Sequence, residues 1–281
     1  MKISLYTAMR DCIQQDYPFL EMLRHHLPLA DEIVVNEGYS TDGTYEAICG
    51  LDPKVKVFRT HWQHPHGESW WIHFKNEARL RCTGDWCVHL DCDEFIPEWE
   101  FEELRHHLTN TVDSLVGVRF TNFYGNYRVF HPRPADVKWI THKIIIHRNL
   151  PDIQFWGDGA NVRLGERALS WNETRKSFNV HHFGCVRSAA KLRQAWWSAG
   201  RFRRGKSIRL QPPALLFKLF PHCWTDPQFF PGLEVYNGPL IAAVVDNPGR
   251  FVRDDHAHLP TIAPTQECRH LVPKLRHRSI S

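Results

Sequence analysis

Residues 1–94 alternate regularly between short apolar runs and segments of helical period, and this alternation constrains the fold more than any other feature. Strand runs joined through helices predict parallel strands with right-handed crossovers and helices on both faces of the sheet. We therefore expect an α/β fold built on a mixed, mostly parallel central sheet. The expected strands are 2–8, 32–36, 55–59 and 86–90, and the expected helices are 17–27, 44–49 and 69–82.

A run of carboxylates closes the last of these strands. Residues 83–94 form a turn, a short apolar strand and then Asp91, Asp93 and Glu94. Carboxylates this close repel one another, so their joint ionisation calls for a compensating charge such as Mg²⁺ or Mn²⁺. Ligands of open α/β sheets bind at the carboxyl ends of strands. We expect a metal–diphosphate site here, and the alternative is an acidic loop that caps the strand and faces water.

The composition limits the class of protein. The chain has 281 residues, 42% of them hydrophobic, which suffices for a substantial core. A net charge of +4 suits an anionic ligand without calling for nucleic acid. The eight cysteines include no Cys-x-x-Cys pair, which disfavours a zinc ribbon or a redox dithiol. No signal peptide is recognisable and no apolar run reaches the roughly 18 to 20 residues of a membrane span. We expect a cytoplasmic protein, soluble or peripheral at the inner face of the membrane.

The pattern changes after the carboxylate run. A Glu-rich helix is expected at 98–107, followed by β-rich segments at 115–120, 127–130 and 138–147. Beyond residue 187 the chain has helical period and then many prolines. We predict a core over 1–186, with a ligand-binding half over 1–94 and a second half over 95–186, and a helical, basic, Pro-rich extension over 187–281 packed on that core.

Three motifs occur in a specific order: an acidic strand end leading to Ser40-Thr41-Asp42-Gly43-Thr44, the helical segment Phe74-Lys75-Asn76-Glu77-Ala78, and the turn Gly84-Asp85-Trp86 before the carboxylates. Together they resemble the family 2 glycosyltransferases, over roughly the first third of the chain. The resemblance implies a GT-A fold with a Rossmann-like sheet, a nucleoside-diphosphate-sugar donor, Mn²⁺ or Mg²⁺ as cofactor, and inversion at the anomeric carbon. It also makes the second half, 95–186, the acceptor side.

Individual site residues follow from the same resemblance. It assigns the divalent metal to Asp93, Asp91 and His182. Lys75 stands where many members have Arg, and a lysine meets a phosphate as a point charge without a bidentate fork. Tyr39 is an additional residue relative to the commonest spacing. The residues implied to contact the donor nucleotide are Thr7, Ala8, Arg10, Glu37, Lys75, Asp91, Cys92 and Asp93.

The segment Val180-His181-His182-Phe183-Gly184 looks like the His-aromatic-Gly segment that many members place after the acceptor region. Consecutive side chains of an extended segment point to opposite sides, so His181 and His182 cannot both reach one ion. We favour His182 as the metal ligand because it directly precedes the aromatic-Gly pair. The alternative is that both histidines pack or form hydrogen bonds.

Inverting transfer needs a base that deprotonates the acceptor hydroxyl. Asp158 is our candidate because it lies between Gly157 and Gly159 in a loop of the acceptor half. The alternative is an ordinary turn aspartate. Glu173 and Asp152 are the next candidates.

Residues 187–218 carry a basic stretch interleaved with aromatic residues. It would contact an anionic membrane near a lipid-linked acceptor, close over the diphosphate, or bind RNA. A solvated basic helix is the default. We rank the membrane or acceptor role above RNA and expect no specific nucleic acid, because no RNA-binding motif is present. The histidines of 61–68 match no familiar zinc spacing.

We predict a metal-dependent inverting glycosyltransferase that moves a single sugar to a glycan or lipid-linked acceptor. One alternative is a nucleotidyltransferase that forms a nucleotide-sugar, although residues 7–11 lack the usual glycine-rich phosphate loop. The other is a non-catalytic glycan- or RNA-binding module on a transferase fold. A processive synthase is disfavoured, because membrane spans and a Gln-x-x-Arg-Trp motif are both missing from the sequence.

Overall fold

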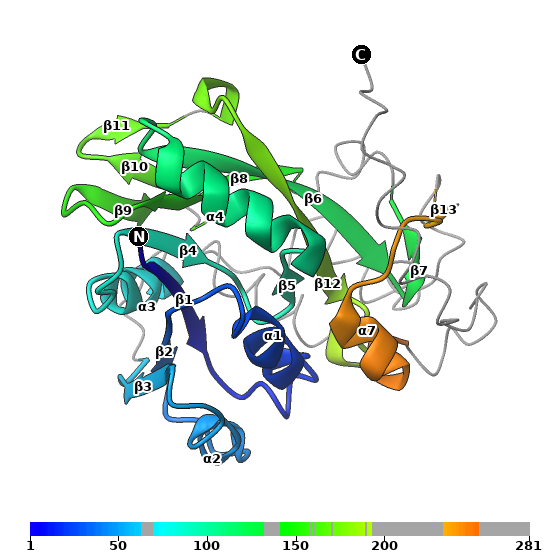
Figure 1. The fold of residues 1–281 in the computed structure, drawn as a ribbon. Helices are drawn as coiled ribbons and strands as arrows, with labels where there is room; N and C mark the ends of the chain where they lie inside the picture. The colour runs from blue at the N-terminus through cyan, green and yellow to red at the C-terminus, as the bar shows by residue number, and fades with distance from the viewer. Residues whose placement is uncertain are drawn as a thin grey trace, which may run out of the picture.

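A computed structural model describes residues 1–62, 70–131, 141–157, 159, 161–169, 171–188, 190–192 and 233–252. A curled ten-stranded sheet forms the centre of the molecule, and a separate three-stranded sheet lies beside it (Figure 1). The central strands follow the order β13-β7-β6-β8-β4-β1-β2-β3, with β12 beside β6 and β5 beside β12. Most strands share one direction, namely β1, β2, β3, β4, β6, β12 and β13, whereas β5, β7 and β8 run the opposite way.

The N-terminal half is the parallel part of this sheet, as the sequence predicts. β1 pairs in parallel with both β2 and β4, and β2 pairs with β3. The carboxyl ends of these strands therefore meet at one edge. The elements are β1 (Ile3–Met9), α1 (Phe19–His26), β2 (Glu32–Glu37), α2 (Thr44–Ile48), β3 (Val55–Arg59), α3 (Trp70–Arg79) and β4 (Trp86–His89).

The second half extends the sheet mainly by antiparallel pairing. β8 joins the free side of β4, β6 joins β8, and β12 returns in parallel beside β6. Residues 90–93, between β4 and β5, form a turn that we call the acidic turn. β5 follows this turn and pairs with β12, so β12 runs close to the turn. The elements are β5 (Glu94–Phe95), η1 (Glu98–Glu100), α4 (Phe101–Asn110), β6 (Leu115–Tyr124), β7 (Asn126–Phe130), β8 (His142–Arg148) and β12 (Ser177–Cys185).

The three-stranded sheet packs against α3. It consists of β9 (Ile153–Trp156), β10 (Asn161–Leu164) and β11 (Arg167–Ala168), followed by η3 (Trp171–Glu173). Asn76 of α3 acts as the link, because its amide nitrogen donates to the Phe155 carbonyl at 3.2 Å and its amide oxygen accepts from the Phe155 N–H at 2.8 Å. The Lys-Asn motif of α3 thus fixes the start of the 157–159 loop.

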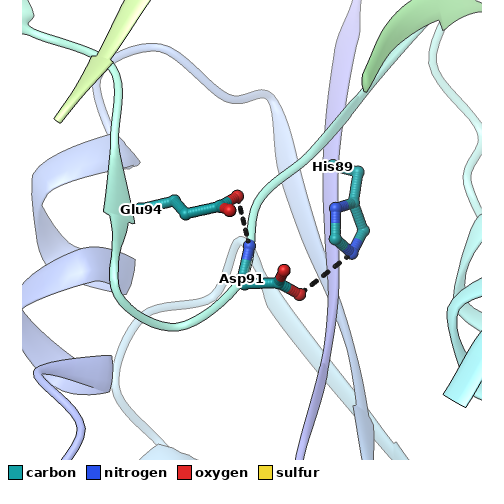
Figure 2. Close-up of side chains that lie close together, drawn as sticks. All are labelled: His89, Asp91 and Glu94. Atoms are coloured by element: carbon teal, nitrogen blue, oxygen red, sulfur yellow. Dashed lines mark hydrogen bonds and ion pairs between the residues drawn. The ribbon is translucent and has the colours of Figure 1, made fainter. Parts of the chain in front are cut away.

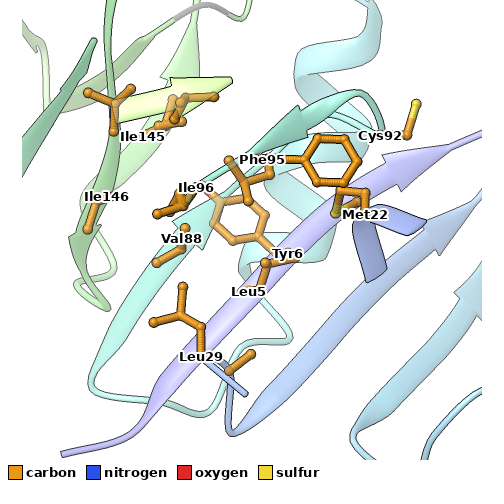
Figure 3. Close-up of a cluster of buried hydrophobic side chains, with 14 of the residues drawn as sticks. Leu5, Tyr6, Met22, Leu29, Val88, Cys92, Phe95, Ile96, Ile145 and Ile146 are labelled. Carbon is orange, nitrogen blue, oxygen red and sulfur yellow. The ribbon is translucent and has the colours of Figure 1, made fainter. Parts of the chain in front are cut away.

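The core lies between the central sheet and its helices (Figure 3). Burial of such aliphatic and aromatic side chains contributes about 1.5–3 kcal/mol each. One polar chain crosses it: the Tyr6 hydroxyl lies 2.9 Å from His147 Nε2, and His147 Nδ1 lies 2.9 Å from the Arg148 carbonyl. Burial lowers the pKa of His147 to about 4. The labelled apolar members are Leu5, Tyr6, Met22, Leu29, Val88, Cys92, Phe95, Ile96, Ile145 and Ile146.

The C-terminal described segment also belongs to this core. It contains β13 (Glu234–Val235), α7 (Ala242–Asp246) and η6 (Pro248–Phe251), and it contributes Ile241, Val244 and Phe251 to the buried cluster. The division of the chain at residue 186 stays a prediction, and most of 187–232 lies outside the described residues. Within the described part, every helix is too short or too polar to cross a bilayer.

Candidate active site

The acidic turn connects β4 to β5 at the carboxyl edge of the parallel strands. The backbone N–H of Asp91 donates to Glu94 Oε2 at 3.0 Å and closes the turn on itself (Figure 2). The N–H of Phe183 on β12 donates to the Asp93 carbonyl at 2.9 Å. The turn is therefore held both by β4, which leads into it, and by β12, which is far away in the sequence. Its backbone has a fixed position relative to β12.

Asp91 is surrounded by cationic groups. Its carboxylate lies 3.0 Å from Lys75 Nζ and 3.7 Å from Lys143 Nζ. His89 Nε2 lies 3.6 Å away (Figure 2). Burial alone would raise the pKa of Asp91, but Lys75, His89 and Lys143 together lower it well below its ordinary value. Asp91 is thus an ionised carboxylate that already has counter-charges from the protein.

Glu94 is fully buried and has its own lysine. Lys143 Nζ donates to Glu94 Oε1 at 2.6 Å, and the other oxygen of Glu94 accepts the Asp91 N–H. Burial would lower the pKa of Lys143, but the carboxylates of Glu94 and Asp91 raise it above its ordinary value. Lys143 therefore stays charged despite its burial.

Asp93 differs from its two neighbours. It is only 6% exposed. Among the residues that the structure describes, its single ion-pair partner is His182, whose Nε2 lies 3.8 Å from Asp93 Oδ1. No lysine or arginine of the described chain forms an ion pair with it. Lys143 and Arg187 interact with Asp93 electrostatically from beyond ion-pair distance, and a buried carboxylate without a close cation favours binding of a further positive charge.

The two adjacent histidines of β12 point in opposite directions. His182 faces the acidic turn, and its Nδ1 lies 2.7 Å from Asn122 Oδ1 on β6. In the neutral ring Nδ1 is then the donor, and the Nε2 lone pair faces Asp93. His181 faces the core, where its Nε2 lies 3.3 Å from the Tyr236 hydroxyl. Burial lowers the pKa of His181 to about 3, so this ring stays neutral in the aromatic cluster.

Gly184 leaves open the space between Asp93 and His182. A Cβ at this position would lie 2.5 Å from His182 Nε2 and 3.0 Å from Asp93 Oδ2. Any side chain would displace the imidazole or fill the gap that the two ligand atoms face. The glycine of the His-aromatic-Gly segment therefore keeps this space free.

Two sets of side chains have ligand atoms within 4.8 Å of one another: His89, Asp91 and Glu94, and Asp93, Glu94 and His182. Lysines already neutralise the carboxylates of the first set. The second set offers the Asp93 carboxylate, which has no described lysine or arginine within ion-pair distance, an imidazole nitrogen of His182 and an open gap, and Mn²⁺ or Mg²⁺ accepts such oxygen and nitrogen donors. Asp93 and His182 fit a divalent ion better than Asp91 does.

The predicted nucleotide contacts lie along the same edge. Thr7 of β1 is fully buried, and its hydroxyl oxygen has no hydrogen-bond partner. Ala8 is half-buried, while Arg10 is exposed and lies 3.3 Å from Asp11. Cys92 is buried within the turn, and its pKa is raised by contact with the Cys12 thiol and by burial.

Lys75 connects the acidic turn to the three-stranded sheet. Besides Asp91, its Nζ contacts the Gly159 carbonyl at 3.3 Å. It also lies 5.2 Å from the centre of the Phe155 ring. The lysine is 8% exposed. Its ammonium therefore lies between Asp91 and the backbone of Gly159.

Glu37 is fully buried and organises the loop after β2. Its carboxylate accepts the N–H groups of Tyr39 and Ser40 at 3.1 and 2.6 Å, and Arg59 Nε at 2.7 Å. Tyr39 has a φ of +54°, and its ring stacks on His61 with centroids 3.9 Å apart. Contact of Glu37 with a nucleotide stays a prediction, since both its oxygens are engaged in the loop.

Some predicted positions lie outside the described residues. These are Asp158, His64 and His66 of the 61–68 cluster, and most of the basic stretch 187–218. Of the reserve candidates for the base, Glu173 pairs with Arg167 at 2.5 Å, and Asp152 lies in the exposed turn before β9. Neither of these two contacts the acidic turn.

The structure adds three residues that the sequence analysis missed, His89, Lys143 and Asn122, and it gives Gly184 of the His-aromatic-Gly segment a role. His89 could have been noticed, because a histidine two residues before Asp91 shares a face of the strand with it. Lys143 and Asn122 belong to other strands, and only the sheet topology brings them to the turn.

Comparison with known proteins shows to which family the chain belongs. A family model described as "Glycosyl transferase family 2" matches residues 11–168. The chain belongs to this family and is a glycosyltransferase. Together with the sheet topology, the match confirms the GT-A fold expected from the sequence. It also disfavours the nucleotidyltransferase alternative. No protein with a curated description matches significantly.

Several solved structures are similar at low identity. TarS 1-349 of S. aureus in complex with UDP-GlcNAc is 19% identical over 44% of this chain and 36% of its own, with a TM-score of 0.36. Another structure of TarS 1-349 is 13% identical over 81% and 73%, with a TM-score of 0.42. Glucosyl-3-phosphoglycerate synthase of Mycobacterium tuberculosis, in complex with Mn²⁺ and UDP-glucose, is 19% identical over 42% and 43%, with a TM-score of 0.33. The match thus spans less than half the length of two of these three structures.

Proposed function

We propose that this glycosyltransferase is a metal-dependent, inverting enzyme that transfers a single sugar from a nucleoside-diphosphate-sugar to a glycan or lipid-linked acceptor. One observation carries the metal dependence: no lysine or arginine of the described residues lies within ion-pair distance of the buried Asp93 carboxylate, which faces Nε2 of His182 at 3.8 Å. Lysines form ion pairs with Asp91 and Glu94, whereas no described lysine or arginine does so with Asp93, and this difference supports Asp93 as the residue that binds an external cation.

Asp93 and His182 would hold the divalent ion. Asn122 fixes the tautomer of His182, and such outer hydrogen bonds commonly orient metal-binding imidazoles. When bound, the ion supplies positive charge beside the diphosphate leaving group of the donor. Gly184 supports this role because the gap that it leaves is bordered by the two ligand atoms.

The chain's own residues account for the rest of the chemistry. The donor binds along the carboxyl edge of β1, β2 and β4, where Thr7, Ala8, Arg10 and Cys92 lie. Lys75, held between Asp91 and the Gly159 carbonyl, provides a fixed positive charge at this edge. Asp158 accepts the proton of the acceptor hydroxyl as that oxygen attacks the anomeric carbon from the face opposite the leaving group.

A thermal-shift panel tests the proposal. The full chain is heated with each nucleoside diphosphate, with Mn²⁺ alone, and with both. We expect one nucleotide to raise the melting temperature strongly only when Mn²⁺ is present, and Asp93→Asn to abolish that synergy. Equal stabilisation by the nucleotide with and without metal would refute the metal dependence. Absence of sugar transfer from the donor with that nucleotide, across a panel of glycan and lipid-linked acceptors, would favour a binding module.

A further inference from the structure

Lys143 is a buried cation that lies outside the sequence motifs that indicated the family. It lies on β8, is 6% exposed, and its Nζ donates to Glu94 Oε1 at 2.6 Å. The same ammonium lies 3.7 Å from Asp91 Oδ2 and 4.6 Å from the centre of the Phe120 ring. Desolvating a lysine to this degree is expensive, and two carboxylates are needed to stabilise it.

The sheet register explains how Lys143 reaches the turn. β8 pairs antiparallel with β4, with Trp86 opposite Arg148 and Val88 opposite Ile146. Continued past the end of β4, this register brings Lys143 level with Asp91. The backbone of the sheet therefore sets where the lysine begins, and its ammonium is held by Glu94 and Asp91.

Without Lys143, Glu94 would lose its lysine and Asp91 would keep only Lys75, so the residues around Lys143 would suit a cation. Ligand atoms of His89, Asp91 and Glu94 lie within 4.8 Å of one another. Neither ring nitrogen of His89 has a hydrogen-bond partner, although the side chain is only 1% exposed and Nε2 faces Asp91 at 3.6 Å. An unpartnered buried imidazole beside two carboxylates is a typical transition-metal donor set.

We propose that Lys143 is a positioning residue that takes the place of a second metal ion at the acidic turn. Its ammonium pairs with Glu94, shares Asp91 with Lys75, keeps His89 free of metal together with Lys75, and so confines the divalent ion to Asp93 and His182. This inference rests on the proposed function, because it assumes that Asp93 and His182 bind the ion. Its distinct claim is that the protein itself suppresses a second site next to the first.

Mn²⁺ titration of the full chain, followed by electron paramagnetic resonance, tests the proposal without any substrate. The wild-type chain should bind one Mn²⁺ at the turn. Lys143→Met, which keeps the length and removes the charge, should bind two, and the double variant Lys143→Met with His89→Ala should return to one. Lys176→Met is the matched control, because Lys176 pairs with Glu103 far from the turn. That control should bind one ion with unchanged affinity.

Stability in chelator gives a second readout. Removal of one partner of a buried ion pair is strongly destabilising, so Lys143→Met in EDTA should melt at least about 5 °C below the wild type. Mn²⁺ should restore most of this loss in the variant, since the extra ion replaces the missing ammonium. Lys143→Arg should behave like the wild type in both experiments. If Lys143→Met does not fold even with Mn²⁺, Lys143→Gln is titrated in its place.

Two outcomes separate this inference from the proposed function. One bound Mn²⁺ of unchanged affinity in Lys143→Met, or in Lys143→Gln where that replaces it, would overturn the role of Lys143. Undiminished binding of Mn²⁺ by Asp93→Asn would instead overturn the assignment of the primary site. Two ions bound by the wild-type chain, of which one is lost in His89→Ala, would show that Lys143 does not exclude a second metal.

Discussion

His182 Nδ1 on β12 lies 2.7 Å from the amide oxygen of Asn122 on β6, directly across a parallel strand pair. The contact joins residues 60 positions apart and sets which nitrogen of the imidazole faces Asp93. Because the backbone register places these two residues opposite each other, the orientation of the ring is built into the sheet.

Asn122→Leu should weaken metal binding while the chain stays folded. Without the acceptor, the ring can adopt the tautomer that turns an N–H toward Asp93. Loss of such an orienting partner typically costs about 10- to 100-fold in metal affinity. Mn²⁺ titration measures the effect. Asn179→Leu is the control, because Asn179 lies on β12, the strand of His182, and its side chain is exposed. Equal Mn²⁺ affinity of Asn179→Leu and Asn122→Leu would contradict the role of the hydrogen bond.

Gly184→Ala should abolish metal-dependent donor binding. The new methyl group would lie 2.5 Å from His182 Nε2, so the imidazole must move by about an ångström, and displacements of this size cost on the order of 100-fold in rate. Circular dichroism and the melting temperature report on the fold, and a transfer assay with Mn²⁺ reports on the site. At Gly249 no atom lies within 4 Å of an added Cβ, so Gly249→Ala should remain active. Equal activity of both variants would remove the close approach from the mechanism.

Asp158→Asn should lower kcat by about 100- to 10,000-fold and leave donor binding intact, because a general base acts only on the acceptor. Single-turnover transfer with saturating donor, combined with calorimetric measurement of donor affinity, separates the two effects. Asp152→Asn and Glu173→Gln, in the same half of the chain, are the comparison variants. Near-normal turnover of Asp158→Asn would transfer the role to another residue, and loss in only one comparison variant would identify it.

Glu32→Gln should reduce stability at neutral pH and make little difference in acid. Glu32 accepts from Lys56, from the Ser4 hydroxyl at 2.5 Å and from the Thr83 N–H at 2.6 Å. Burial would raise its pKa, but these donors lower the pKa to about 2 from an ordinary value of 4.5. The native state therefore favours the ionised form, and the resulting stabilisation is fully present above pH 4.5 and is lost as the pH falls to about 2.

Urea unfolding at several pH values measures this contribution. At pH 7 the variant should lose about 2–3 kcal/mol of unfolding free energy, and the difference from the wild type should shrink as the pH falls from about 4.5 to about 2. Glu46→Gln, at an exposed position of α2, should have a small effect at every pH. A Glu32→Gln deficit that stays constant down to pH 2 would show that charge is not the cause.

Local patterns were sufficient to predict much of the fold. Strands of the parallel half follow from apolar runs of four to seven residues, and their observed bounds, such as Glu32–Glu37, agree closely with the expected ones. Pairing between distant strands was not predictable, because it depends on packing of the whole sheet. The return of β12 beside β6 and the contact of Asn76 with Phe155 are of this kind.

The candidate site was likewise predictable only where it depends on local sequence. A contiguous motif carries Asp91, Asp93 and Glu94, so their proximity is visible in the sequence. Their different electrostatic states are not visible, since these depend on Lys143 of β8, which is three strands after β5 in the sequence, and on Lys75 of α3. The opposite directions of His181 and His182 follow from strand geometry, but which ring faces the core depends on the aromatic side chains that surround it.

The hydrogen bond between the Tyr236 hydroxyl and His181 Nε2 has a consequence for shortened versions of this enzyme. His181 and His182 are neighbours on β12. The contact of Tyr236 with His181 therefore also helps to fix the position of His182. A truncation ending before residue 233 would remove that support and leave a buried imidazole beside an apolar gap. Trimmed proteins made for crystallisation or engineering would retain the whole acidic motif and still lose a well-placed ligand.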